Sequence, residues 1–200
     1  MVPVEGREHV LCISHCLGQH SPIESRPPNC QVHSAMSSEC FAVRKGAAGD
    51  IESIASFNIL MAEETENLRL DPGVILAGVN GMIENPERGF YLVVENSENT
   101  DPEIVGSLMI TTEWSDWRNG TFWWIQSVYV LPEFRRRGLY RLLYEQVREL
   151  ARGSHDVCGF RLYVEKDNTT AQATYRNLGM EETDYRLYEE LVSGLNFTLS

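Results

Sequence analysis

The segment at residues 121–152 constrains the fold of this chain more than any other part of the sequence. Residues 121–130 are rich in β-branched and aromatic side chains, which favour a β-strand. Pro132 ends that strand, and a short arginine-rich loop leads directly into a helix on which Leu143, Val147 and Leu150 recur at helical spacing. A strand, a tight loop and an amphipathic helix in direct succession are typical of an α/β domain.

The other segments from residue 40 onward also alternate between strand and helix patterns. We predict strands at residues 40–44, 90–94, 104–112, 160–164 and 185–188, and helices that begin at Ile51, Pro72 and Thr169. Asp50 is expected to cap the first of these helices, and Pro72 occupies the first position of the second. The polar loop at residues 113–120 indicates that the strands on either side of it form an antiparallel pair.

Residues 1–37 differ in composition from the rest of the chain. Four of the five cysteines and four of the five histidines lie in the first 40 residues, Pro27-Pro28 blocks regular structure, and large apolar side chains are few. Zinc binding here is the less favoured alternative because there is no Cys-x-x-Cys pair, and no metal is expected. We therefore predict a weakly ordered N-terminal extension at residues 1–37 and one folded domain at residues 38–200.

The net charge of −12 is unevenly distributed along the sequence. Residues 41–134 carry 5 basic and 15 acidic side chains, whereas residues 135–200 carry 10 of each. The acidic middle argues against nucleic-acid binding, and every apolar run is far shorter than the ~20 residues that span a bilayer. We therefore expect neither a nucleic acid nor a membrane as partner, and a cytoplasmic location, since no targeting signal is seen.

The arginine-rich loop is expected to bind an anion. The first N–H groups of a helix have no intrahelical partner, and the helix dipole favours negative charge there. Arg135, Arg136, Arg137 and Arg141 lie beside this helix start, where cations are unfavourable unless an anionic partner is present. Gly138 allows the backbone to approach a ligand closely. These features predict a phosphate-bearing ligand, and the alternative is a solvated basic first turn.

This loop resembles motif A of the GNAT acetyltransferase superfamily, Arg/Gln-x-x-Gly-x-Gly/Ala, which binds the pyrophosphate of acetyl-CoA. Arg135 stands at the Arg/Gln of that motif and Gly138 at its first glycine. Tyr140 stands where glycine or alanine is usual, so its ring has to point away from the pantetheine or line its channel.

A second segment, Asn168-x6-Tyr175-x3-Gly179, resembles the second signature of that family, Asn-x6-Tyr-x3-Gly. The resemblance covers about residues 40–190. It implies the GNAT fold, of the α/β (α+β) class, with a mixed, mainly antiparallel central sheet of about six or seven strands flanked by helices.

The resemblance also implies the chemistry, which is direct transfer of an acetyl group from acetyl-CoA, used as a co-substrate, to an amine. Tyr175 lies at the position of the family's general-acid tyrosine, and a phenol with a pKa of about 10 suits protonation of a thiolate. The implied cofactor-binding residues are Val128, Tyr129, Val130, Arg135, Arg136, Arg137, Gly138, Leu139, Tyr140, Arg141, Asn168 and Tyr175.

The general base and the acceptor pocket are less closely defined. Residues 112–126 loosely resemble the diamine acetyltransferase branch, in which a glutamate at the position of Gln126 accepts the amine's proton through water. Because glutamine cannot act as a base, Glu113 and Asp116 are the candidate catalytic bases, with solvent water as the alternative. Trp117 and Gln126 are the candidate substrate-binding residues, since tryptophan faces can hold a cation, although packing is the alternative role of strand aromatics.

We therefore expect an acetyl-CoA-dependent N-acetyltransferase that acts on a primary amine of a small molecule, such as a polyamine or an amino-acid-like compound. Two alternatives stay open: a protein lysine or N-terminal acetyltransferase, which needs an open peptide groove, and a non-catalytic acyl-CoA-binding module. Gln126 and Tyr140 favour the non-catalytic module mildly, whereas Tyr175 argues against it. The oligomeric state is also open, with a homodimer as one alternative.

Overall fold

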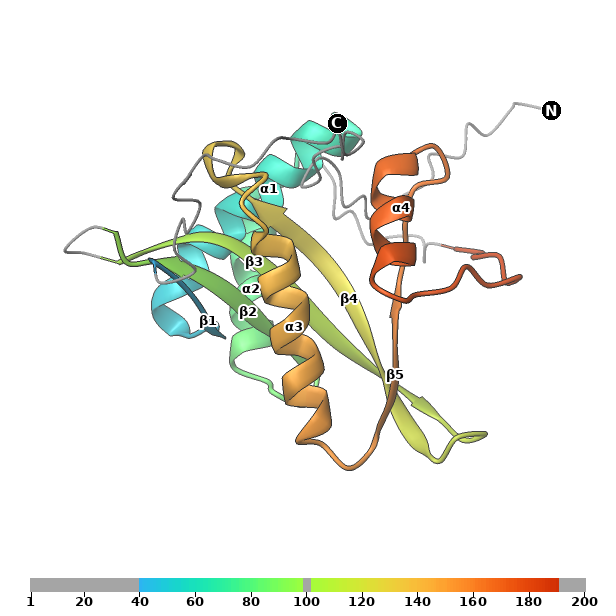
Figure 1. Ribbon diagram of the computed structural model, residues 1–200. Helices are drawn as coiled ribbons and strands as arrows, with labels where there is room; N and C mark the ends of the chain where they lie inside the picture. The colour runs from blue at the N-terminus through green and yellow to red at the C-terminus, as the bar shows by residue number, and fades with distance from the viewer. Residues whose placement is uncertain (1–39, 99–101, 191–200) are drawn as a thin grey trace, which may run out of the picture.

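A mixed β-sheet with helices on both faces forms the body of the protein (Figure 1). The computed structural model describes residues 40–98 and 102–190. The strands are β1 (Phe41–Lys45), β2 (Gly89–Asn96), β3 (Glu103–Ser115), β4 (Gly120–Val130) and β5 (Val157–Leu162). The helices are α1 (Ile51–Glu66), α2 (Pro72–Ile83), α3 (Leu139–Arg152) and α4 (Thr169–Asn177), with 3-10 turns η2 (Ala48–Asp50) and η3 (Pro132–Phe134).

The described strands lie in the order β1-β2-β3-β4-β5. Neighbours from β1 to β4 pair antiparallel, and β4 pairs parallel with β5 across the connection that contains α3. The predicted fold class and the antiparallel pairing of β3 with β4 are confirmed.

The alternation of side chains along each strand produces two apolar cores, one on each face of the sheet. Leu92 and Ile125 point to the face covered by α3, where Leu143 and Val147 complete one core. Tyr91 and Val93 point to the opposite face and pack against α1 and α2. Figure 1 shows α3 in front of the sheet and α1 and α2 behind it.

The starts of α1 and α2 differ from each other in how they are capped. Asp71 accepts a hydrogen bond from the backbone N–H of Val74 at 2.9 Å, and Pro72 takes the first helical position as predicted. The prediction that the Asp50 side chain caps α1 is wrong. Its carboxylate instead accepts hydrogen bonds from the Ala47 N–H and from Arg44 on β1. Although burial opposes it, this pairing holds the pKa of Asp50 below its usual value.

The predicted count of six or seven strands is wrong for the described part of the chain, which contains five strands. Residues 185–188 form no strand, and Tyr185 and Tyr188 are exposed. A strand needs a hydrogen-bonding neighbour, and none of the described strands pairs with this segment. The strand predicted at residues 160–164 lies earlier, at Val157–Leu162.

The predicted extension at residues 1–37, with its cysteines and histidines, lies outside the described residues. Within the described ranges, Cys158 is an exposed free thiol, and no cluster of three or more His, Cys, Asp or Glu side chains has the geometry to hold a metal. None of the helices within those ranges combines the length and apolar character needed to cross a membrane.

Candidate functional site

A β-bulge interrupts the pairing of β4 with β3 just beyond the point where the pairing of β4 with β5 ends. Met109 of β3 pairs with Gln126, and Ser107 pairs with Tyr129, so two residues of β4 lie opposite one residue of β3. Ser127, one of these two, adopts a left-handed backbone with φ of 47°. The pairing of β4 with β5 ends at Ile125, just before the bulge. Beyond Ile125, β4 continues without a described partner on its β5 side, because β5 ends at Leu162.

The loop between η3 and α3 leaves the start of that helix without a side-chain cap. Gly138 is the N-cap residue of α3, has φ of 79°, and offers no side chain to the first-turn N–H groups. Arg136 also has a positive φ, of 65°. A Cβ atom added at Gly138 would meet no heavy atom within 4 Å, so the glycine is needed for its conformation and leaves open space at the helix start.

The arginines of the loop fall into two groups. Arg136, Arg137 and Arg141 are exposed beside the start of α3, and the Arg137 guanidinium lies 5.1 Å from the centre of the Phe134 ring. Arg135 is largely buried, with 15% of its side chain exposed. The exposed group is therefore placed to meet an anion at the helix start, whereas Arg135 is engaged within the protein.

Arg135 ties the loop to β4 and to the end of α1. Its Nε donates to the backbone carbonyl of Val130 at 2.8 Å, and its Nη2 donates to Glu64 at 2.7 Å. The hydroxyl of Tyr129 donates to the other oxygen of Glu64 at 2.8 Å. Burial and the neighbouring Glu64 carboxylate raise the pKa of Tyr129, so its hydroxyl stays protonated. We call Glu64, Tyr129 and Arg135 the loop brace.

The two motif tyrosines lie together between α3 and α4. Tyr140 and Tyr175 are 3% and 5% exposed, and their rings meet edge to face with centroids 6.1 Å apart. Tyr175 belongs to the apolar core on the α3 face of the sheet, which also includes Val128 and Val130 of β4. The ring of Tyr140 therefore points into the core and leaves the open space at Gly138 unfilled.

Asn168 caps α4, because its side-chain oxygen accepts a hydrogen bond from the backbone N–H of Ala171 at 3.0 Å. This capping fixes the start of the helix that carries Tyr175.

Leu139 is buried at the start of α3 and contributes its main chain to the loop.

Gln126 and Glu113 lie on the face of the sheet that α1 and α2 also occupy. The Gln126 amide donates to the hydroxyl of Thr111. Glu113 accepts hydrogen bonds from Trp124 and from Arg161 of β5. Although burial opposes it, these bonds hold the pKa of Glu113 below its usual value, which weakens it as a base.

A comparison with protein families decides the identity of the fold. The acetyltransferase (GNAT) family matches residues 55–180, which is more than half of the chain. The chain belongs to the GNAT family. A protein of Clostridium difficile 630, whose crystal structure is described as that of a possible acetyltransferase, is 41% identical to it. That comparison covers 77% of this chain and 99% of the other, with a TM-score of 0.70.

More distant structures share the GNAT fold with this chain. The structure of AAC(6')-Iy in complex with the bisubstrate analogue CoA-S-monomethyl-acetylneamine is 15% identical, with coverage of 76% and 98% of the two chains and a TM-score of 0.59. A transcriptional regulator from Bacillus halodurans C-125 is 20% identical, with coverage of 76% and 99% and a TM-score of 0.62. A comparison with curated proteins found no match.

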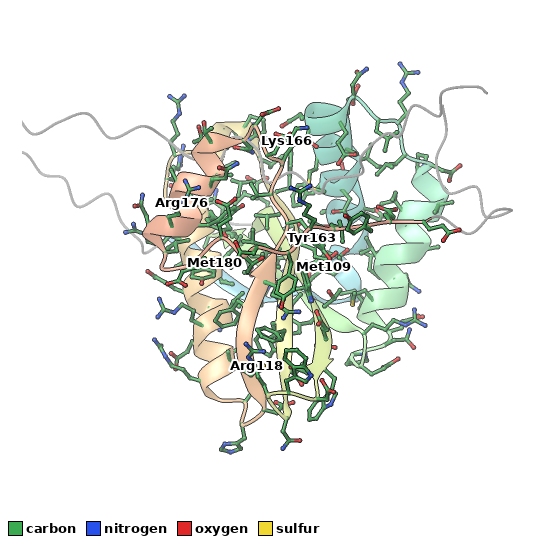
Figure 2. The ribbon with its side chains drawn as sticks, turned by 90° about the vertical axis from the view of Figure 1, so that its right-hand side faces the viewer. Met109, Arg118, Tyr163, Lys166, Arg176 and Met180 are labelled. Atoms are coloured by element: carbon green, nitrogen blue, oxygen red, sulfur yellow. The ribbon has the colours of Figure 1, made fainter. Side chains whose placement is uncertain are left out.

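Two of the predicted site residues of this GNAT protein lie far from the motif loop. Asp116 and Trp117 are in the turn between β3 and β4, and Trp117 is 86% exposed. With a rise of about 3.3 Å per residue, the start of β4 at Gly120 is roughly 23 Å from the bulge at Ser127. Figure 2 shows Arg118, next to this turn, at the end of the molecule opposite to Lys166. The structure therefore does not bring Asp116 or Trp117 together with Tyr175.

Sequence reasoning did not find Glu64 or Arg161, which the structure brings to Arg135 and Glu113 respectively. Glu64 lies near the end of a helix among other acidic residues, and Arg161 lies within a predicted strand. Each pairing joins residues that are far apart in the sequence, so no local pattern could have indicated it.

Proposed function

We propose that this protein is an acetyl-CoA-dependent N-acetyltransferase that transfers the acetyl group directly to a primary amine of a small molecule. The observation that carries the proposal is the separation of β4 from β5 at the bulge, directly before an uncapped helix start that is flanked by three exposed arginines. Acetyl-CoA carries an acetyl thioester and a pyrophosphate. The segment of β4 that is not paired with β5 suits the thioester, and the start of α3 suits the pyrophosphate.

The residues of the loop fit the pyrophosphate. The N–H groups of Leu139, Tyr140 and Arg141 begin α3 without a side-chain cap, and the helix dipole adds positive potential there. Arg136, Arg137 and Arg141 supply the balancing charge from the solvent side. In this proposal Arg135 acts indirectly, because the loop brace holds the loop in place from the α1 side.

The main chain of β4 is proposed to hold the rest of the cofactor. The backbone of Val128 to Val130 is not paired with β5, and those of its groups that neither β3 nor Arg135 engages can bind the amide groups of pantetheine and the thioester carbonyl. Asn168 contributes by capping α4 beside this opening.

The reaction forms one N–C bond and breaks one C–S bond. The attacking amine nitrogen loses a proton, and the departing sulfur gains one. We propose that Tyr175 donates the proton to sulfur, because it lies in the same core cluster as Val128 and Val130 on the separated strand. Gln126 has no basic atom, and Glu113 is held at a lowered pKa, so water that reaches the open sheet face is proposed to take the amine's proton.

Release of CoA thiol tests this function. The purified chain is mixed with acetyl-CoA and a panel of small primary amines, and thiol formation is followed by a colorimetric reagent. Turnover that depends on the amine, with an acetylated product of the expected mass, supports the proposal. Binding of acetyl-CoA without turnover of any amine would favour the non-catalytic acyl-CoA-binding module instead.

A further inference from the structure

Arg161 of the edge strand β5 lies on the same face of the sheet as Glu113 and Gln126. Arg161 of β5 pairs in register with Trp124 of β4, and Glu113 of β3 lies opposite Phe122. Together with Tyr163, these residues form what we call the Arg161 cluster. In Figure 2 the β5 edge of the sheet faces the viewer. Tyr163 and Met109 of β3 lie on one side of β5, and Met180 lies on the other side.

Contacts on several sides hold the Arg161 guanidinium in place. Its Nη1 atom donates to both carboxylate oxygens of Glu113, at 2.7 and 2.9 Å. The guanidinium carbon lies 3.8 Å from the centre of the Phe122 ring and 5.7 Å from that of Trp124. The Trp124 ring is itself packed against Tyr163, with centroids 4.5 Å apart. The side chain is thus ordered before any ligand arrives.

Part of this fixed guanidinium remains available. Within the described residues, Arg161 makes hydrogen bonds through Nη1 alone, which leaves the N–H groups on Nε and Nη2 unused. Its side chain is 37% exposed, so these groups can reach a ligand. Two N–H groups side by side match the two oxygens of a carboxylate.

The same contacts make the cluster unsuitable for a second positive charge. A cation bound here would need the carboxylate of Glu113 and the faces of Phe122 and Trp124, and Arg161 already holds all three. A distal ammonium group, as in a diamine, would therefore meet the like charge of the guanidinium. A distal carboxylate would instead meet its unused N–H groups.

The register of β4 sets the length of such an acceptor. Trp124, which pairs with Arg161, lies about 10 Å along β4 from Ser127 at the bulge. An extended chain advances about 1.2 Å per bond, so roughly eight bonds bridge this distance. An α-amino acid is too short to place its α-amine at the bulge and its carboxylate at Arg161, whereas an ω-amino acid with about eight bonds between the two groups is long enough.

We propose that Arg161 determines acceptor specificity by binding a carboxylate at the far end of the amine, so that the acceptors are ω-amino carboxylates and not diamines. This inference rests on the proposed function. The inference assigns the substrate class of that function. It also changes the role of Glu113, from the base predicted from the sequence to a positioning residue that orders Arg161.

Three acceptors with the same eight-carbon chain test the inference. These are 8-aminooctanoate, octylamine and 1,8-diaminooctane, which carry a negative, a neutral and a positive distal end. We expect kcat/KM to be highest for the carboxylate and lowest for the diamine, with about tenfold or more between these two, through differences in KM. An equal or reversed order in the wild-type protein would overturn the inference.

Variants of Arg161 connect this preference to the cluster. Arg161→Gln should lower the ratio of kcat/KM for 8-aminooctanoate to that for octylamine by about tenfold, and Arg161→Lys, which keeps the charge but lacks the paired N–H groups, should lower it less. Arg152→Gln is the matched control, because Arg152 is an exposed arginine paired with Glu149 on α3. A ratio that is unchanged in a folded Arg161→Gln variant would refute the assignment.

A binding measurement separates this inference from the proposed function. If no amine is acetylated, the proposed function fails, and calorimetry with 8-aminooctanoate in the presence of CoA then measures binding at the carboxylate site directly. Binding to the wild-type protein that is lost in Arg161→Gln would support a carboxylate site at Arg161. Equal binding, or no binding to either protein, would overturn it.

Discussion

Gly138 offers the sharpest test of the anion site, because its conformation and its surroundings give separate expectations for two substitutions. Its φ of 79° disfavours any side chain, and the open space around it means that a Cβ atom causes no clash. Gly138→Ala should therefore cost about 1–2 kcal/mol of stability through backbone strain. In this variant, any loss of affinity for acetyl-CoA should come only from displacement of the loop.

Gly138→Asp adds a negative charge to the same strain. A carboxylate about 6 Å from one ligand charge, at an effective dielectric constant between 20 and 80, costs about 0.7–2.8 kcal/mol of binding free energy. With two charges on the pyrophosphate, we expect acetyl-CoA to bind at least about tenfold more weakly than it binds to Gly138→Ala. Isothermal titration calorimetry at low salt measures the dissociation constants of both variants. Added salt should reduce the difference between them, because it screens the charge of the aspartate.

Gly179→Asp is the matched control for this experiment. Gly179 follows α4 with φ of 86° and likewise has no heavy atom within 4 Å of an added Cβ, so the variant carries the same strain and charge outside the loop. Equal affinities in Gly138→Asp and Gly138→Ala, or an equal loss in Gly179→Asp, would refute the reasoning that an anion binds at the start of α3.

Three further substitutions test other parts of the structure. Tyr175→Phe keeps the ring packing and should lower turnover about 10²–10⁴-fold with little change in acetyl-CoA affinity, and normal turnover would assign the tyrosine to packing. Glu64→Gln weakens the hold on Arg135 and should reduce acetyl-CoA affinity about threefold to tenfold by calorimetry, whereas tighter binding would show that the brace restrains Arg135 from the ligand. Asp50 has a lowered pKa through Arg44, so its stabilisation is present above pH ~4 and is lost at lower pH. The difference in Tm between the wild-type protein and Asp50→Asn should therefore shrink as the pH falls below about 4, and a constant difference would contradict this.

The elements that the sequence predicts well are those whose signals are local. Pro72 and Asp71 lie next to each other and begin α2 as expected, and the apolar spacing at Leu143 and Val147 predicts the buried face of α3. Asp50 shows where local signals fail. It has the residue type and position of a helix cap, yet Arg44 on the neighbouring strand binds its carboxylate. A tertiary partner thus replaced the local one.

The same distinction applies to the candidate site. The motif loop is continuous in sequence, so its strand, glycine and helix start could all be predicted, including the exposed arginines. The role of Arg135 could not be, because its partner Glu64 is 71 positions away. Likewise Glu113 has the residue type of a base, and only the fold brings Arg161, 48 positions later, onto its carboxylate.

The bulge in β4 links the two faces of the sheet and thereby the two halves of the proposed site. In a regular strand, Gln126 and Tyr129 would point to opposite faces, since their positions differ by an odd number. The extra residue at Ser127 reverses the alternation, so Tyr129 turns to the α1 face, where it packs on Phe57 and binds Glu64. Glu64 in turn holds Arg135. The position of the proposed anion-binding loop therefore depends on the one-residue insertion that follows the end of the pairing of β4 with β5, so a change that removes the bulge should disturb cofactor binding and acceptor placement together.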